Sequence, residues 1–276
     1  MRHILTITWL TFHEARRRRM VLAALGMGAV FIAIFAIGVY LIGNELRDRG
    51  APLQATRQAY SFLLLAGLYV VHFLTVMLAI FASVDTIAGE IASHTIQTLV
   101  TRPVRRWQII VGKWLGFAGM LLLYLGALAG GVLLAMQLIV GYSPPNALAG
   151  LSLLGLEALL LLSLSMLGGT RLSSLTNGVL LFMLYGLAFV GAWVEQVGAL
   201  LESRAAVRIG IIASLLLPVE ALWRRAAYLM QPALARTLPT PFTTASVPSP
   251  AMVVYGVCFA AIALLLALRS FGRRDL

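Results

Sequence analysis

The sequence predicts an all-α polytopic membrane protein with six transmembrane helices. Of its 276 residues, 61% are hydrophobic and only 11% are charged, and the mean hydropathy is +0.94. A soluble domain of this length is not so poor in charge. The apolar residues gather in long runs, close to the roughly 20 residues with which a helix crosses the hydrocarbon of a membrane. We expect a single membrane domain over residues 1–276 and no separate soluble domain.

Six segments free of charge, or nearly so, are predicted to span the membrane. They are approximately residues 20–42, 60–84, 114–140, 147–168, 172–194 and 251–268. Residues 44–58 are expected to form a short outer loop, and the two prolines within residues 141–146 separate spans three and four. Residues 209–219 are apolar but too short to span at about 1.5 Å per residue. We predict that they form a re-entrant segment on the outer face before span six.

Basic residues predict the orientation of the chain. Arg16–Arg19 directly precede the first span, which indicates a cytoplasmic N-terminus under the positive-inside rule. Six spans then place the C-terminus on the same side, together with 13 of the 21 basic residues. Arginines at span ends meet anionic lipid headgroups, and this accounts for the net charge of +11 without a nucleic-acid partner.

The N-terminal residues 2–19 are predicted to form an amphipathic interfacial helix on the cytoplasmic side. Leu5, Trp9 and Phe12 share one narrow face of this helix. Such a helix lies along the membrane surface with its tryptophan at headgroup depth. Simple anchoring of the first span and contact with a cytoplasmic partner are both open roles for it.

The third span carries a glycine face. Its members are Gly112, Gly116, Gly119, Gly126 and Gly130. Small residues on one face let another helix approach closely in lipid. We expect this face to pack within the subunit, and a seam between two subunits is the alternative.

Two ionisable residues are predicted near the bilayer midplane. His72 lies at the middle of span two and Glu157 at the middle of span four. Each needs a partner or a water-filled cavity at that depth. We expect the two side chains to contact each other and fix the packing of their helices, with contact to a substrate or a proton as the alternative. No other charged residue is expected at this depth.

Catalytic and cofactor motifs are absent from the sequence. It has no nucleophile elbow, no paired histidines at zinc-protease spacing and no phosphate-binding loop. The only cysteine, Cys258, permits neither an internal disulfide nor a thiolate metal cluster. We expect no metal and no cofactor bound by this chain. An intramembrane enzyme built on His72 and Glu157 is a minor hypothesis.

The segment between spans two and three, residues 85–113, is the most informative loop. Ala92, Ile96 and Leu99 follow helical spacing and predict a short amphipathic helix beneath the membrane. Pro103 ends this helix, because the residue before a proline avoids helical geometry. The aliphatic residues indicate a surface that binds a partner.

The string GEIASHTIQTLVTRPVRRWQIIVGKWLG resembles the signature of ATP-binding-cassette (ABC) type-2 permeases, the membrane subunits of many bacterial ABC exporters. That signature has a glutamate, a Gly-Thr pair shortly after it, an aliphatic helix, a proline followed by an arginine, and an aliphatic run that ends in Gly-Lys. This sequence departs from it at His94, where the family usually has the glycine. The residues at these places are Glu90, Thr95, Leu99, Pro103, Arg106, Gly112 and Lys113. The predicted six spans, N-terminal helix and re-entrant segment are similar to this family as well, over nearly the whole chain.

The resemblance implies a permease of the bacterial inner membrane that works as a homo- or heterodimer with two copies of a separate ABC ATPase. ATP and Mg²⁺ would bind to that ATPase, so the chain itself would not be an enzyme. The loop between spans two and three would be a coupling helix docked on the ATPase, with the inner loop at Arg171 as a second contact. The resemblance assigns coupling to Glu90, Thr95, Leu99, Arg102, Arg105 and Arg106.

A membrane anchor or assembly scaffold is the alternative function. Such a protein binds a partner complex without moving cargo, and the family includes a branch that assists the maturation of nitrous-oxide reductase. The sequence neither selects nor excludes that branch. Export, as the direction of transport, follows from the resemblance alone.

Overall fold

A computed structural model describes residues 2–17, 19–84, 86, 89, 105–233 and 246–273. Within these residues the regular elements are all helices. Six of the helices are long and apolar enough to cross a membrane. The predicted fold class, an all-α polytopic membrane protein, is therefore confirmed.

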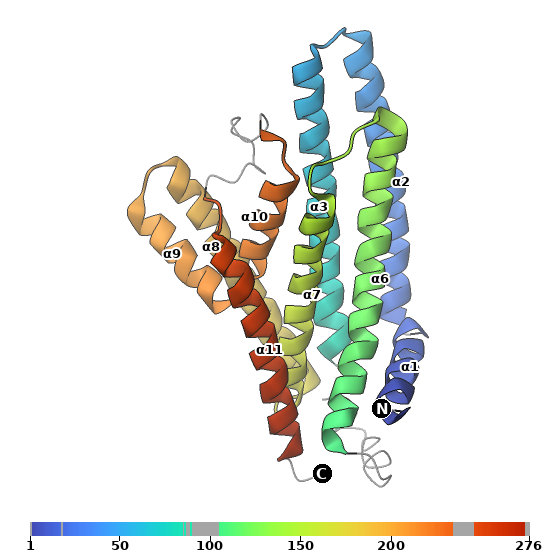
Figure 1. Ribbon diagram of the computed structural model, residues 1–276, viewed down its shortest axis with the longest axis vertical. Helices are drawn as coiled ribbons and strands as arrows, with labels where there is room; N and C mark the ends of the chain where they lie inside the picture. The colour runs from blue at the N-terminus through green and yellow to red at the C-terminus, as the bar shows by residue number, and fades with distance from the viewer. Residues whose placement is uncertain are drawn as a thin grey trace.

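The helices follow one another as α1 (Arg2–Arg17), α2 (Arg19–Asp48), α3 (Leu53–Val84), α6 (Arg106–Val140), α7 (Ala147–Gly169), α8 (Ser174–Leu200), α9 (Arg204–Leu216), α10 (Val219–Met230) and α11 (Pro250–Gly272). The six spans are α2, α3, α6, α7, α8 and α11. In Figure 1, α1 begins and α11 ends at the lower end of the bundle, and the turn between α2 and α3 forms its upper end.

Several helices are longer than the sequence predicts. The outer loop expected at residues 44–58 is mostly helical, since α2 runs to Asp48 and α3 begins at Leu53. Polar residues such as Arg47 and Gln54 are good helix formers and continue the helix beyond its apolar part. At the other end of the bundle, α6 begins at Arg106, well before the predicted apolar span of residues 114–140. A hydropathy pattern predicts the apolar part of a helix that lies in the hydrocarbon, and not the polar turns by which the helix extends beyond it.

α7 is the central helix of the bundle. It packs against α3, α6, α8, α10 and α11, and both α3 and α7 are largely buried within the chain. The outer helices α2 and α11 leave most of their apolar surface exposed. In a membrane protein such a surface faces lipid or another subunit. The polar side chains that α3 and α7 carry are therefore enclosed by protein.

α9 and α10 form a bent hairpin between the last two spans. The two helices meet at an angle of 107°, with the break at Leu217 and Pro218. Figure 1 shows α9 descending from the top of α8 and α10 rising again toward the upper end. At 13 and 12 residues, neither helix is long enough to span by itself. The segment that dips into the bundle is thus longer than the predicted residues 209–219.

Candidate coupling and intramembrane sites

Most of the predicted coupling residues lie outside the described part of the chain. These are Glu90, Thr95, Leu99 and Arg102. Arg105 and Arg106, which follow them, are described at the start of α6. The backbone N–H of Arg105 donates to Oε1 of Gln108 at 3.1 Å, which caps the first turn. Nη1 of Arg106 donates to the carbonyl of Gly272 at 3.4 Å and so connects α6 to the end of α11.

Lys113 holds together the two helices that flank the coupling segment. Its side chain is buried, and Nζ donates to the backbone carbonyl of Thr86 at 3.3 Å. Thr86 follows the end of α3, whereas Lys113 lies in the second turn of α6. A charged donor to a carbonyl is one of the stronger hydrogen bonds in proteins. The ends of α3 and α6 at the base of this segment are therefore joined.

The glycine face of α6 receives the N-terminal helix α1. A Cβ atom on Gly112 would lie 2.7 Å from Cβ of Ile7, and one on Gly116 would lie 2.8 Å from Cβ of Thr11 and 3.0 Å from the carbonyl oxygen of Thr8. Real Cβ contacts are not so short, so α1 can pack here only because these two positions lack a side chain.

The other glycines of this face behave differently. A Cβ atom at Gly119 would approach Phe12 at 3.9 Å, which is ordinary contact. Apart from the adjacent backbone of α6 itself, no described atom lies within 4 Å of a Cβ atom placed at Gly126 or Gly130. The predicted close approach is thus seen at the lower end of α6, and its partner is α1 rather than another span.

His72 lies between two glutamates near the middle of α3. Its Nδ1 is 2.7 Å from Oε1 of Glu157 on α7, and its Nε2 is 3.3 Å from Oε1 of Glu220 on α10. The contact with Glu157 is the one that the sequence predicts. Glu220 contradicts the expectation that no other charged residue reaches this depth. We call these three residues the His72 cluster.

The His72 cluster is closed to solvent in this conformation. All three residues are at most 3% exposed. The imidazole stacks against Trp223 with ring centroids 5.1 Å apart and against Tyr69 at 5.6 Å. An enclosed cluster of this kind favours the predicted packing role over contact with a substrate.

The chemistry of the His72 cluster matches its geometry. Nε2 of His72 is within hydrogen-bond distance of Glu220, whereas Nδ1 and Glu157 form an ion-pair contact; an imidazole with protons on both ring nitrogens is a cation that can pair with both carboxylates. Glu220 lies in the first turn of α10, where the helix dipole stabilises a negative charge. The cluster joins two spans and the hairpin at one point, so none of the three elements can move there independently.

The sequence contains a signal for Glu220 that span prediction does not use. Buried Val219, Leu222, Ala226 and Met230 recur at helical spacing directly after Pro218. This pattern is typical of an amphipathic helix with proline at its start. The pattern does not predict how deep this helix lies in the membrane, because that depth depends on how α9 and α10 fold back into the bundle.

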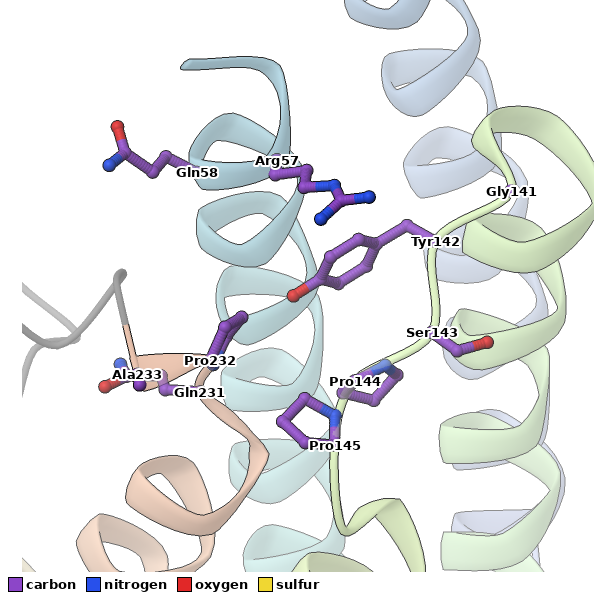
Figure 2. A pocket seen from close by; sticks show the side chains of 10 residues that line it. All are labelled: Arg57, Gln58, Gly141, Tyr142, Ser143, Pro144, Pro145, Gln231, Pro232 and Ala233. Carbon is purple, nitrogen blue, oxygen red and sulfur yellow. The ribbon is translucent and has the colours of Figure 1, made fainter. Parts of the chain in front are cut away.

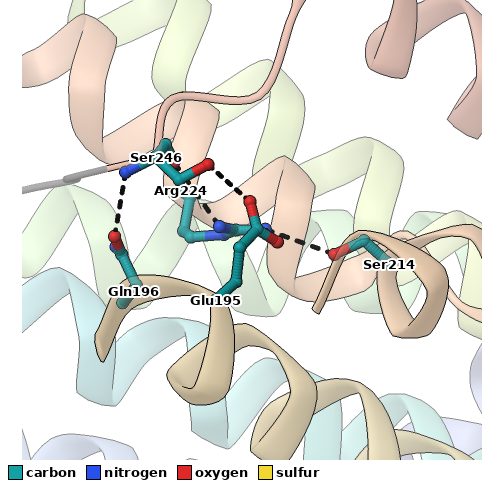
Figure 3. A network of polar contacts seen from close by, with 5 residues as sticks. All are labelled: Glu195, Gln196, Ser214, Arg224 and Ser246. Carbon is teal, nitrogen blue, oxygen red and sulfur yellow. Dashed lines mark hydrogen bonds and ion pairs between the residues drawn. The ribbon is translucent and has the colours of Figure 1, made fainter. Parts of the chain in front are cut away.

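A second buried polar network lies toward the upper end, where α8, α9 and α10 meet (Figure 3). Nη2 of Arg224 donates to Oε2 of Glu195 at 2.7 Å and to Oγ of Ser214 at 3.2 Å. Ser246, after the undescribed residues 234–245, donates through Oγ to Oε1 of Glu195 at 2.6 Å and through its N–H to Gln196 at 3.2 Å. Glu195 and Arg224 are both buried, so this ion pair fixes the hairpin to α8.

Glu195→Ala is expected to lower the free energy of unfolding by about 3–5 kcal/mol, because it leaves the buried guanidinium of Arg224 without its carboxylate. Chemical unfolding in detergent micelles measures the loss. Glu45→Ala is the matched control, since Glu45 forms an exposed pair with Arg49 worth about 0–1 kcal/mol. Equal losses in the two variants would contradict a structural role for the Glu195–Arg224 pair.

A cavity of about 620 Å³ opens at the upper end of the bundle (Figure 2). It is bordered by the start of α3, the loop between α6 and α7, and the residues that follow α10. Arg57, Tyr142 and Gln231 supply its polar groups, and Pro144 and Pro145 form part of its wall. Burial raises the pKa of Tyr142, so its hydroxyl stays protonated at neutral pH. Among the described residues that line it, the cavity combines the cation of Arg57 with neutral donors and acceptors.

Six helices in the described part of the chain are long and apolar enough to cross a membrane, and they pack around an apolar core with a few buried polar clusters; this arrangement defines an integral membrane protein. A family profile described as "ABC-2 family transporter protein" matches residues 5–276. The chain therefore belongs to the ABC-2 transporter family, and it is a permease component of an ABC transporter. No curated protein matches the sequence.

Proposed function

We propose that this chain is the transmembrane permease subunit of an ATP-driven exporter of the bacterial inner membrane. Two permease subunits, identical or different, would associate with two copies of a separate ATPase, which binds ATP and Mg²⁺. The lower end of the bundle would face the cytoplasm. This orientation is supported by Arg105, Arg106, Arg171, Arg269 and Arg273, all at the lower end.

The observation that carries the proposal is the docking of α1 on the glycine face of α6. α6 begins at Arg106, the last of the predicted coupling residues, and α1 packs against its first turns. Lys113 adds the end of α3 to the same assembly. We call α1, the lower part of α6 and the lower end of α3 the lever. A force on the coupling segment would move the lever as one body.

The His72 cluster gives the lever a connection to the hairpin. α3 carries His72 and α7 carries Glu157, while the hairpin carries Glu220. A shift of α3 would therefore carry α7 and α10 with it at this point, and would change the wall of the upper cavity near Gln231. In this way ATP binding below would open a path above. We assign no cargo, since an apolar pathway and a lipid-facing surface use the same residues.

Glu90→Arg and Arg105→Glu test the coupling to an ATPase. Each variant should insert normally and reduce the ATPase that copurifies with the permease by about tenfold or more, since like charges across an interface cost several kcal/mol. Copurification from membranes, measured by quantitative mass spectrometry, gives the ratio of the two subunits. Arg49→Glu, at the upper end, is the matched control and should leave the ratio unchanged.

An unchanged complex and unchanged ATP turnover in both coupling variants would overturn this assignment. Stable ATPase binding without any ATP turnover dependent on cargo would favour the alternative, a membrane anchor or assembly scaffold that transports nothing. The measurement compares the ATP turnover of the complex with and without extracts of the periplasm and membrane. It therefore distinguishes the two functions without requiring that the cargo be known in advance.

A further inference from the structure

Three arginines line a cavity at the lower end of the bundle, for which the proposed function names no ligand. The cavity has a volume of about 590 Å³ and lies between the turn that joins α7 to α8 and the last turn of α11. Arg171 comes from the turn, while Arg269 and Arg273 come from α11. None of the described residues that line the cavity is acidic. The site therefore concentrates positive charge.

The arginines are held on a fixed frame. Nε of Arg171 donates to Oγ of Ser270 at 3.1 Å, and Oγ1 of Thr170 donates to the same oxygen at 2.9 Å. These bonds connect the turn to α11, so the two sides of the cavity keep their separation. Guanidinium groups in such an arrangement match the oxygens of a phosphate, which they bind with paired N–H donors.

The other half of the lining is apolar. Leu167, Leu172 and Leu266 line the cavity beside the arginines. Leu266, which lines the cavity, is itself 47% exposed, so the apolar part of the lining reaches a surface that suits acyl chains. A purely ionic partner, such as an acidic loop of an ATPase, would pair with the arginines but make no apolar contact with the leucines. An amphiphile with an anionic headgroup would interact with both the arginines and the leucines.

We propose that this cavity is a binding site for an anionic phospholipid, with the phosphodiester between Arg171, Arg269 and Arg273 and an acyl chain along Leu172 and Leu266. Basic cavities between transmembrane helices bind anionic headgroups in this way. The lipid would bridge the end of α7, the turn that follows it and the end of α11 in the lower leaflet. The inference is independent of the coupling segment, so it survives or fails separately from the proposed exporter function.

Native mass spectrometry of the purified full chain in detergent tests the site, with dioleoyl-phosphatidylglycerol and dioleoyl-phosphatidylcholine as probes. The wild type should retain phosphatidylglycerol in preference to phosphatidylcholine. Arg171→Gln combined with Arg269→Gln should weaken phosphatidylglycerol binding by about 25-fold, at about fivefold for each arginine removed. Arg204→Gln combined with Arg208→Gln removes two exposed arginines of α9 and should leave the affinity unchanged.

Two further results separate the possible ligands. Glycerol phosphate, which has the headgroup charge without acyl chains, should not displace the lipid at equal concentration, and equal displacement would overturn the lipid assignment. The assignment also fails if the Arg171 and Arg269 variant retains wild-type lipid binding, or if the control pair loses as much affinity. Loss of ATPase copurification with intact lipid binding would assign the cavity to the partner protein.

Discussion

Replacing His72 by leucine is expected to destabilise the protein by about 3–5 kcal/mol, one of the two largest effects that the structure predicts. The variant leaves Glu157 and Glu220 buried without a cation between them. Breaking a buried ion pair costs this much because the remaining charge is neither solvated nor paired. Unfolding in mixed micelles, followed by tryptophan fluorescence, measures the loss, and Trp223 stacked on the imidazole reports on the site itself.

Two comparisons show whether charge or volume is responsible. Phe73→Leu changes the next residue of α3, which is 45% exposed, and should cost less than about 1 kcal/mol because surface substitutions are usually mild. The triple variant His72→Leu, Glu157→Gln, Glu220→Gln removes both buried charges and should recover more than half of the loss. If the triple variant is no more stable than His72→Leu alone, charge compensation is not what holds the cluster together.

The cluster also shows how far sequence reasoning reaches. His72 and Glu157 were predictable because each lies at the centre of a long apolar segment, where an ionisable group needs a partner. The position of Glu220 was not predictable, because hydropathy predicts a midplane location only for residues at the centre of an apolar span of about 20 residues. The hairpin reaches that depth with two short helices and a sharp break at Pro218, a tertiary arrangement that no local pattern specifies.

The same distinction applies to the glycine face. Its existence follows from residue spacing alone, since Gly112 and Gly116 must lie on one side of a helix. The identity of the packing partner does not follow from this spacing, because a glycine face predicts a close contact but not which element makes it. The amphipathic α1 was expected along the membrane surface, and that location stays a prediction. What the structure adds is that the face of α1 with Ile7 and Thr11 packs on α6, while Leu5 and Trp9 remain exposed.

Gly116→Leu is expected to separate α1 from α6 and to uncouple the transporter. A side chain at this position meets Thr11 and, at 3.0 Å, the backbone oxygen of Thr8, which cannot rotate away. Overpacking of this kind costs about 1–3 kcal/mol, more than the roughly 1 kcal/mol or less that leucine gains over glycine in helix propensity. The rate of amide hydrogen exchange in residues 2–17 should rise at least fivefold, because α1 loses its packing contact with α6.

Gly126→Leu is the matched control on the same helix. It brings the same gain in helix propensity, and no described atom beyond the adjacent backbone of α6 lies within 4 Å of its Cβ position, so α1 should exchange as in the wild type. If the lever transmits the force, the complex of Gly116→Leu with an ATPase should keep its basal rate of ATP hydrolysis, while the increase in that rate caused by cargo should fall. If α1 is released and coupling persists, the force travels through α6 alone and α1 is only an anchor. If α1 stays protected, the helix tolerates the added side chain and the close approach at Gly116 is not what holds it.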